Sequence, residues 1–182
     1  MRFVLILYLL IFTTNSVNAS SLESARCSAI FYIMTAVGHV EPNLGKYFTQ
    51  QGGLSSMMTG IYLGDETNKP VTNGDVNALK SEQIIWIGNQ YPSKKTFIQN
   101  KIKSCMGWNM AVGKLYQSNK KLIKQKTKFK ALLLSGPSPT KTYKYPFNDF
   151  STVRGYIDVA FNKWIENGKN TPNTIKKLLN KK

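Results

Sequence analysis

The stretch from Ile98 to Leu115, IQNKIKSCMGWNMAVGKL, decides the fold. Its large apolar side chains and its cysteine recur at steps of three and four residues: Ile98, Ile102, Cys105, Trp108, Val112 and Leu115. This spacing places all of them on one face of a helix of about five turns. We therefore predict a long helix that follows a Ser93 N-cap, reaches at least Tyr116 and carries Cys105 on its buried face.

Cys27 lies in a second stripe of the same kind, formed by Cys27, Ile30, Phe31, Met34 and Val37. Cys27 and Cys105 are the two cysteines of the chain, and in an oxidising compartment a disulfide is their expected state. The bond would close a loop of about 79 residues and stabilise the fold by about 4.5 kcal/mol in the chain-entropy model. We predict a structural disulfide, because the chain has no Cys-x-x-Cys motif of a redox-active pair.

Helical periodicity also dominates the rest of the chain. We predict helices over residues 21–37 and 54–63, a third that begins near Asn73 or Asp75 and runs to about Gln90, and a fourth over 151–168. A short helix over 171–180 forms a C-terminal hairpin (151–180) with the helix before it. Residues 41–51 are predicted as a connecting stretch and 64–72 as a loop, while Asp149 or Ser151 caps the helix that follows. The predicted fold class is therefore all-α: a single bundle of five or six helices over residues 20–182, stapled by the Cys27–Cys105 disulfide.

Two further patterns bear on helix packing. Gly60 and Gly64 stand four residues apart, a spacing that lets helices approach closely. The helix predicted at 151–168 has an apolar face made of Val153, Ile157, Ala160, Phe161, Trp164 and Ile165.

The segment 118–150 is basic and rich in loop residues. Lysine occupies every second position from Lys124 to Lys130, which is typical of a strand, but Leu132, Leu133 and Leu134 break the alternation. We favour a helix here and keep the strand as the alternative. Gly136-Pro137-Ser138-Pro139 ends either element, and an aromatic, basic loop (TKTYKYPF) follows at 140–147.

Residues 1–19 are typical of an export signal. A positive end, Met1-Arg2, precedes an apolar run of about ten residues, and Val17-Asn18-Ala19 has the small residues of a cleavage site. The run is shorter than the ~20 residues that span a bilayer, although an uncleaved N-terminal anchor remains the alternative. We expect cleavage near Ala19 and a location in the periplasm or outside the cell, with no transmembrane span in the mature chain.

The composition is strongly basic, with 25 Lys and Arg against 9 Asp and Glu. Twenty-two of the 25 are Lys, a bias that an A+T-rich genome produces by codon usage alone, whereas selected phosphate and carboxylate sites favour the planar fork of Arg. One His and two Cys exclude a His- or Cys-rich metal site. We accordingly predict no metal and no cofactor.

Candidate catalytic groups are few. His39 stands near Glu41, and Asp65-Glu66, Asp75 and Glu82 are further carboxylates that could act as a pair in glycoside hydrolysis. Glu41 followed by Gly52-Gly53-Leu54 resembles the glutamate and Gly-Leu-Met-Gln stretch of lytic transglycosylases, but no Ser follows Glu41 and Ser55-Ser56 replace Met-Gln. This resemblance implies a small peptidoglycan hydrolase that uses carboxylates such as Glu41, which we keep as the alternative function.

Cations interleaved with aromatic rings form the candidate binding surface. The possible anion-binding residues are Lys120, Lys121, Lys124, Lys126, Lys128, Lys130, Lys141 and Lys144, with possible aromatic contacts from Phe129, Tyr143 and Tyr145. Such a surface suits anionic lipid headgroups or acidic polymers, and export makes nucleic acid an unlikely partner; a solvated lysine face is the other reading. We predict an exported, non-enzymatic helical protein that binds an envelope component or another exported protein.

Overall fold

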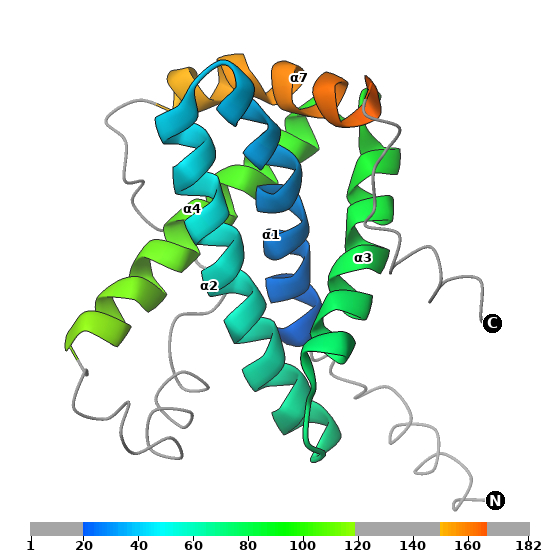
Figure 1. The fold of residues 1–182 in the computed structure, drawn as a ribbon, viewed down its shortest axis with the longest axis vertical. Coiled ribbons are helices and arrows are strands. Elements are labelled where there is room, and N and C mark those ends of the chain that lie inside the picture. Colours follow the sequence, from blue (N-terminus) through cyan, green and yellow to red (C-terminus); the bar gives the residue numbers. More distant parts are fainter. Residues whose placement is uncertain (1–19, 119–149, 167–182) are drawn as a thin grey trace, which may run out of the picture.

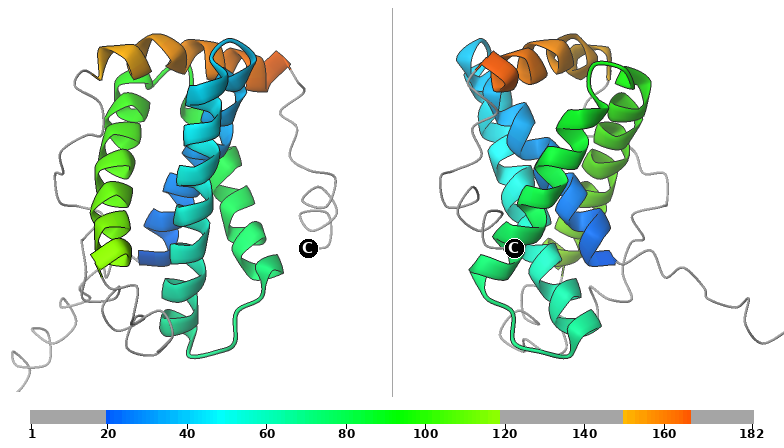
Figure 2. Two further views of the ribbon diagram at one scale, coloured as in Figure 1. Left: turned by 60° about the vertical axis from the view of Figure 1, so that its left-hand side comes forward. Right: turned by 90° about the vertical axis from the view of Figure 1, so that its right-hand side faces the viewer.

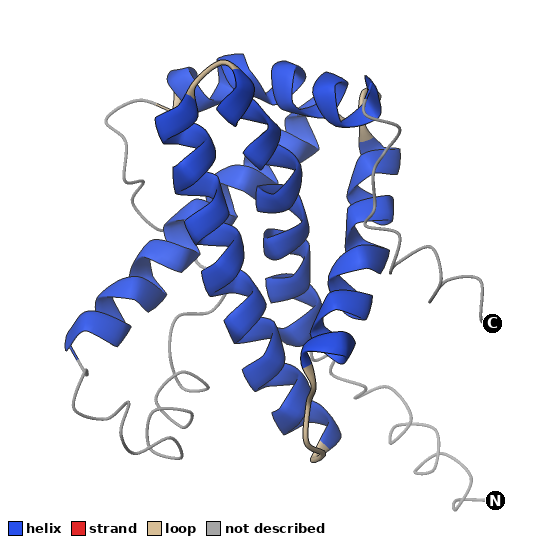
Figure 3. Ribbon diagram, viewed as in Figure 1, coloured by secondary structure: helices blue, strands red, loops and turns tan. Residues whose placement is uncertain are grey.

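The computed structural model describes residues 20–118 and 150–166, and these ranges are helical almost throughout (Figures 1 and 3). They contain five α-helices, one 3₁₀ helix and no strand, which confirms the all-α fold class. In chain order the elements are α1 (Ser20–Met34), η1 (Thr35–His39), α2 (Pro42–Thr67), α3 (Asn73–Gln90), α4 (Lys95–Ser118) and α7 (Ser151–Glu166).

Helix α1 lies at the centre of the bundle. It contacts α2, α3, α4 and α7, and the ribbon views place it among the other long helices with α7 lying across one end of them (Figures 1 and 2). Its sequence explains this position, because apolar and small side chains cover several of its faces: Ser21, Ser24, Ala25, Cys27, Ser28, Ala29, Ile30, Phe31, Ile33 and Met34 are all buried. A helix that is apolar or small on most sides is stable only when it is surrounded.

The predicted disulfide is present and joins α1 to α4. The Cα atoms of Cys27 and Cys105 are 5.4 Å apart, across 78 residues of sequence. Both predicted stripes face the common core, where Phe31, Ile102 and Trp108 are fully buried. The bond therefore fixes the two core faces against each other.

Helix α2 is longer than the sequence predicts. The predicted connecting stretch 41–51 is wrong, because the helix begins at Pro42. Proline is tolerated in the first turn, where the helix needs no N–H donor, and the Glu41 carbonyl already accepts a hydrogen bond from the Gly45 N–H at 3.0 Å. The helix continues through Gly52, whose carbonyl accepts a hydrogen bond from Ser28 Oγ of α1 at 3.2 Å. Packing against α1 thus overrides the low helix propensity of the glycines.

The loop predicted at 64–72 is shorter than expected. Helix α2 runs to Thr67 and ends at Asn68, which has a φ of 50°, a left-handed conformation that commonly ends helices. The next helix, α3, begins at Asn73, the earlier of the two predicted starts, and ends at Gln90 as predicted. Thr72 caps it, since the Asp75 N–H donates to the Thr72 hydroxyl and the Thr72 N–H donates to the Asp75 carboxylate.

The predicted Ser93 cap is wrong, and of the two caps predicted for the helix after residue 150, Ser151 is excluded while Asp149 lies outside the described residues. Helix α4 begins at Lys95, and the Ser93 hydroxyl donates instead to the Gln90 carbonyl at 3.3 Å. Helix α7 begins at Ser151, and its first helical hydrogen bond runs from the Arg154 N–H to the Phe150 carbonyl. Ser151 is therefore a helical residue and not the cap.

The apolar face of α7 has all but one of its predicted members. Ile165 is 39% exposed, whereas the other five are buried: Val153, Ile157, Ala160, Phe161 and Trp164. Trp164 packs against Gly88 of α3. Among the described residues no helix has the length and apolar character needed to cross a membrane.

Several predictions fall outside the described residues. These are the export signal at 1–19, the helix or strand at 124–134, the basic loop at 140–147 and the last helix at 171–180. They remain predictions from the sequence.

Candidate functional site

The predicted anion-binding residues lie in the segment that joins α4 to α7, outside the described part of the chain. This applies to the eight lysines and to the three aromatic residues, Phe129, Tyr143 and Tyr145. Their sequence positions and the charges of the described bundle are therefore the observations that bear on this site.

Positive charge is distributed unevenly along the chain. The described residues 20–118 and 150–166 hold eleven Lys and Arg against eight Asp and Glu, a net charge of +3. Residues 119–149 and 167–182 together hold thirteen Lys against a single acidic residue, Asp149, a net charge of +12. The bundle is therefore close to neutral, and the lysine excess belongs to two segments.

Several cations of the bundle are paired with carboxylates. Glu23 accepts hydrogen bonds from Arg26 of α1 and from Lys101 of α4. The Lys95 ammonium lies 3.1 Å from the Asp158 carboxylate, which connects α4 to α7. These ion pairs neutralise part of the positive charge of the bundle, and they connect α1 to α4 and α4 to α7.

The carboxylates proposed for catalysis lie in separate places. Glu41 is half-buried at the N-cap of α2, and His39 is exposed at the end of η1. Glu66 accepts a hydrogen bond from the Ser21 N–H at 3.0 Å, which places its charge at the N-terminal end of α1, where an anion is favoured.

Asp65 is exposed near the end of α2, and the two remaining acids of interest are on α3. Asp75 takes part in the cap of that helix through one carboxylate oxygen, and the hydrogen bonds from the backbone and side chain of Thr72 lower its pKa. Glu82 is exposed. None of these acids lines either of the two cavities described next.

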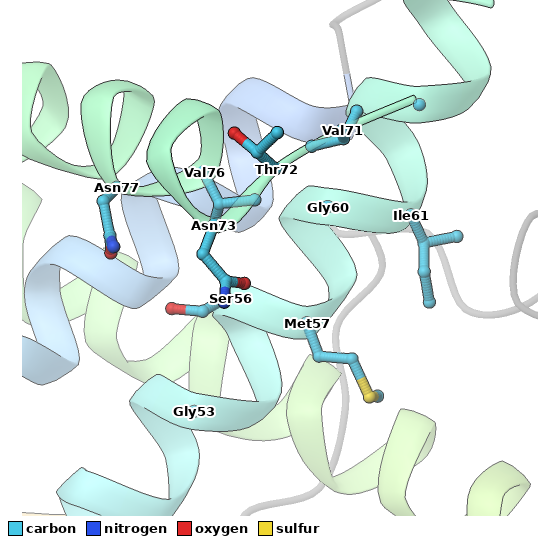
Figure 4. Close-up of a pocket in the computed structure, with 11 residues that line it drawn as sticks. Gly53, Ser56, Met57, Gly60, Ile61, Val71, Thr72, Asn73, Val76 and Asn77 are labelled. Carbon is cyan, nitrogen blue, oxygen red and sulfur yellow. The ribbon is translucent and has the colours of Figure 1, made fainter. Parts of the chain in front are cut away.

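The larger cavity is an open groove of about 990 Å³ between α2 and the start of α3 (Figure 4). One wall is α2, which contributes Gly53, Gly60 and Gly64 together with Ser56, Met57 and Ile61. The other wall is the segment that leads into α3, from Val71 to Asn77. The lining is mixed, with apolar and uncharged polar side chains.

A smaller cavity of about 190 Å³ adjoins the groove and shares Gly53 and Ser56 with it. Its wall includes Ser28 and Tyr32 of α1, and the Ser28 and Ser56 hydroxyl oxygens are 2.7 Å apart. Lys80 of α3 closes one side, with its ammonium 5.8 Å from the Tyr32 ring centroid. Burial lowers the pKa of Lys80.

The sequence did not predict this groove. The spacing of Gly60 and Gly64 indicated a close helix approach, and at Gly60 a Cβ atom would lie 3.3 Å from the Val76 side chain, whereas both glycines also line the groove. The cavity beyond that contact forms where α2 and α3 diverge. The angle between two helices cannot be predicted from a local sequence pattern.

Comparison of the chain with protein-family models, with curated proteins and with solved structures gave no match. Function must therefore be inferred from the chain's own residues.

Proposed function

We propose that this is an exported, non-enzymatic binding protein that engages an anionic envelope component, such as lipid headgroups or an acidic polymer, through the lysine- and aromatic-rich segment 118–150. The disulfide-stapled bundle would act as the scaffold that carries this segment between α4 and α7. The disulfide supports export, because such bonds form and persist mainly in oxidising compartments.

The uneven distribution of charge carries the proposal. Codon drift towards lysine acts on the whole chain, but the 116 described residues contain nine Lys, whereas the 47 residues of 119–149 and 167–182 contain thirteen. Drift also gives no reason for those 47 residues to contain one acidic side chain, since the codons of Asp and Glu are equally compatible with an A+T-rich genome. A segment that binds anions would exclude acidic residues, because like charge with the ligand opposes association.

Binding of this kind should depend strongly on salt. Each lysine near an anionic membrane surface contributes about 1 kcal/mol, and exposed charges are screened beyond about 8 Å at physiological ionic strength. The aromatic rings among the lysines add contacts that salt does not screen.

The test compares two triple variants of the oxidised chain 20–182. Lys124, Lys126 and Lys128 are replaced by Gln in the first, and the exposed bundle residues Lys46, Lys69 and Lys94 in the second. Binding is measured by co-sedimentation with phosphatidylglycerol vesicles, with phosphatidylcholine vesicles and with bead-bound poly-L-glutamate, over a salt series. The vesicle and polymer arms distinguish the two kinds of anion.

We expect the wild-type protein to bind an anionic surface with an affinity that falls steeply with salt. The first variant should bind roughly 10- to 100-fold more weakly, and the second should stay close to wild type. Equal losses in the two variants would mean that net charge alone drives binding. That result, or the absence of binding to every anionic probe, would refute the proposed site.

A further inference from the structure

The two cavities along α2 adjoin each other, since Gly53 and Ser56 line both of them, and they are treated together as one groove. We propose that this groove is a second binding site, which takes a short peptide segment and places a free carboxylate of that peptide beside Lys80. The site goes beyond the proposed function, since it lies on the described bundle and uses none of the lysines of segment 118–150.

The groove has the room that a ligand needs. Its larger part, about 990 Å³, is at the upper end of the roughly 300 to 1,000 Å³ typical of ligand sites. Gly53 keeps the junction of the two parts open, because a Cβ atom there would meet nothing within 4 Å. A glycine inside a helix lowers the stability of that helix by up to about 1 kcal/mol relative to alanine. At position 53 no contact within the described protein requires a glycine.

The groove wall from α3 presents amide groups. Asn73 and Asn77 lie four residues apart and are exposed on the side that lines the cavity (Figure 4). Each side-chain amide has donors and an acceptor, and neither is hydrogen-bonded to another described residue. A peptide backbone offers the complementary groups, and Met57 and Val76 offer apolar surface to its side chains.

Lys80 supplies the charge for one end of the ligand. The Lys80 residue is half-buried and lines the smaller cavity, with its ammonium 5.8 Å from the Tyr32 ring centroid, and no carboxylate among the described residues forms an ion pair with it. A partly desolvated cation without a counter-charge gains from a ligand carboxylate, because the pair offsets the desolvation. The Ser56 hydroxyl lines the same cavity and can turn from Ser28 to donate to that carboxylate, while the Ser28 hydroxyl donates to the Gly52 carbonyl.

A peptide fits these groups better than an acyl chain or a neutral sugar. An acyl chain would cover the Asn73 and Asn77 amides and leave them without hydrogen bonds, which is costly. A neutral sugar would pair the amides but would leave Lys80 uncompensated and the apolar side chains of Met57 and Val76 uncovered. A peptide with a free carboxylate uses all three kinds of group.

The experiment is an NMR titration of the ¹⁵N-labelled, oxidised chain 20–182. The probes are a pool of N-acetylated random pentapeptides with a free C-terminal carboxylate, the same pool as C-terminal amides, an N-acetylglucosamine oligomer and phosphatidylglycerol micelles. Four variants are titrated alongside the wild type: Gly53→Leu, Gly155→Leu, Lys80→Met and the Lys124, Lys126 and Lys128 triple variant. Gly155 is the matched control, since it is a glycine of α7 with open space around its Cβ position and lies outside the groove.

We expect the free-acid pool to shift amide signals of residues 53–64 and 73–80, and the amidated pool to bind about tenfold more weakly. Gly53→Leu should abolish these shifts without lowering the melting temperature, and Lys80→Met should bind both pools equally weakly. Gly155→Leu and the lysine triple variant should behave like wild type, which separates this site from segment 118–150.

Three results would overturn the inference. The first is an absence of peptide-induced shifts in the groove, including the case in which only the sugar or the micelles shift it. The second is unchanged binding by Gly53→Leu. The third is a wild-type protein that binds the acid and amide pools equally.

Discussion

At the scale of single residues, Glu23 shows how two helices are joined beside the disulfide. Its carboxylate binds Arg26 of the same helix and Lys101 of α4, and the Arg26 guanidinium also lies 4.4 Å from the Trp86 ring centroid. Glu23 and Lys101 are separated by 78 residues, as are Cys27 and Cys105. The ion pair and the disulfide are thus two contacts between α1 and α4, one helical turn apart along each helix.

This arrangement makes stability depend on pH. Burial alone raises the pKa of Glu23, but the hydrogen bonds and charges of Lys101 and Arg26 outweigh it, so the pKa lies below its ordinary value of 4.5. A carboxyl group whose pKa is lowered by folding stabilises the protein above its unfolded pKa and loses that effect as pH falls through the folded value.

Glu23→Gln should therefore lower the free energy of unfolding by roughly 2 kcal/mol at neutral pH. The difference from wild type should shrink as pH falls below 4.5. Urea denaturation over a pH series measures both. Glu82→Gln, at an exposed position of α3, is the control and should change the stability by less than about 0.5 kcal/mol. A gap that stays constant with pH would contradict an electrostatic role for Glu23.

Of the contacts between α1 and α4, the sequence could predict the disulfide but not the ion pair. The disulfide follows from two cysteines in two apolar stripes, because spacing alone places each on a buried face. Glu23 and Arg26 lie off that stripe in the sequence, which marks them as polar residues but not as a pair. Lys101 as a partner could not be predicted, since it depends on which faces of α1 and α4 meet and in which direction.

At the scale of elements, helix α2 forms despite the low helix propensity of its glycines, because its packing against η1 and α1 stabilises it. Gly45 is required by a close approach: a Cβ atom there would lie 2.8 Å from the Gly38 nitrogen and closer still to Gly38 Cα. Gly52 is accommodated because α1 packs against it, with its would-be Cβ 3.5 Å from Phe31 Cβ. The glycine pair at 52–53 and Pro42 therefore misled the prediction, which placed a connecting stretch before residue 54.

The glycines of α2 should respond oppositely to alanine. Gly45→Ala should destabilise the protein by about 2 to 3 kcal/mol, because backbone atoms of Gly38 would have to move. Gly53→Ala should stabilise it by up to about 1 kcal/mol, because helix propensity improves and no atom is displaced. Urea denaturation monitored by circular dichroism measures both. Equal effects of the two substitutions would mean that the packing of η1 against α2 is not as described.

Helices with a single continuous stripe were the easiest to predict. The helix around Cys105 and helix α7 each have one clear apolar face, and the described side chains of that face are buried except at Ile165. The start of α4 was missed because Ser93 has the residue type of a cap, whereas its hydroxyl binds the preceding turn at Gln90. Residue type predicts the existence of a helix end better than its position.

At the scale of the whole molecule, a near-neutral bundle carries two strongly basic segments. The all-α fold could be predicted from periodicity, and the central place of α1 agrees with the apolar and small residues on its several faces. The groove along α2 could not be predicted, because it arises from the divergence of two helices. The lysine segment was found from the sequence, and its contrast with the bundle emerged only once the bundle's bounds were known.

The central claim is that this protein is exported, cleaved after Ala19 and works as an oxidised bundle that carries the lysine segment. The most direct measurement is the intact mass of the protein recovered from outside the cytoplasm of an exporting bacterial host, after alkylation without reduction. We predict the mass of residues 20–182 less two hydrogens, with no alkyl group, and a linked Cys27–Cys105 peptide in a non-reducing digest. A mass that retains residues 1–19, or that carries two alkyl groups, would contradict the claim.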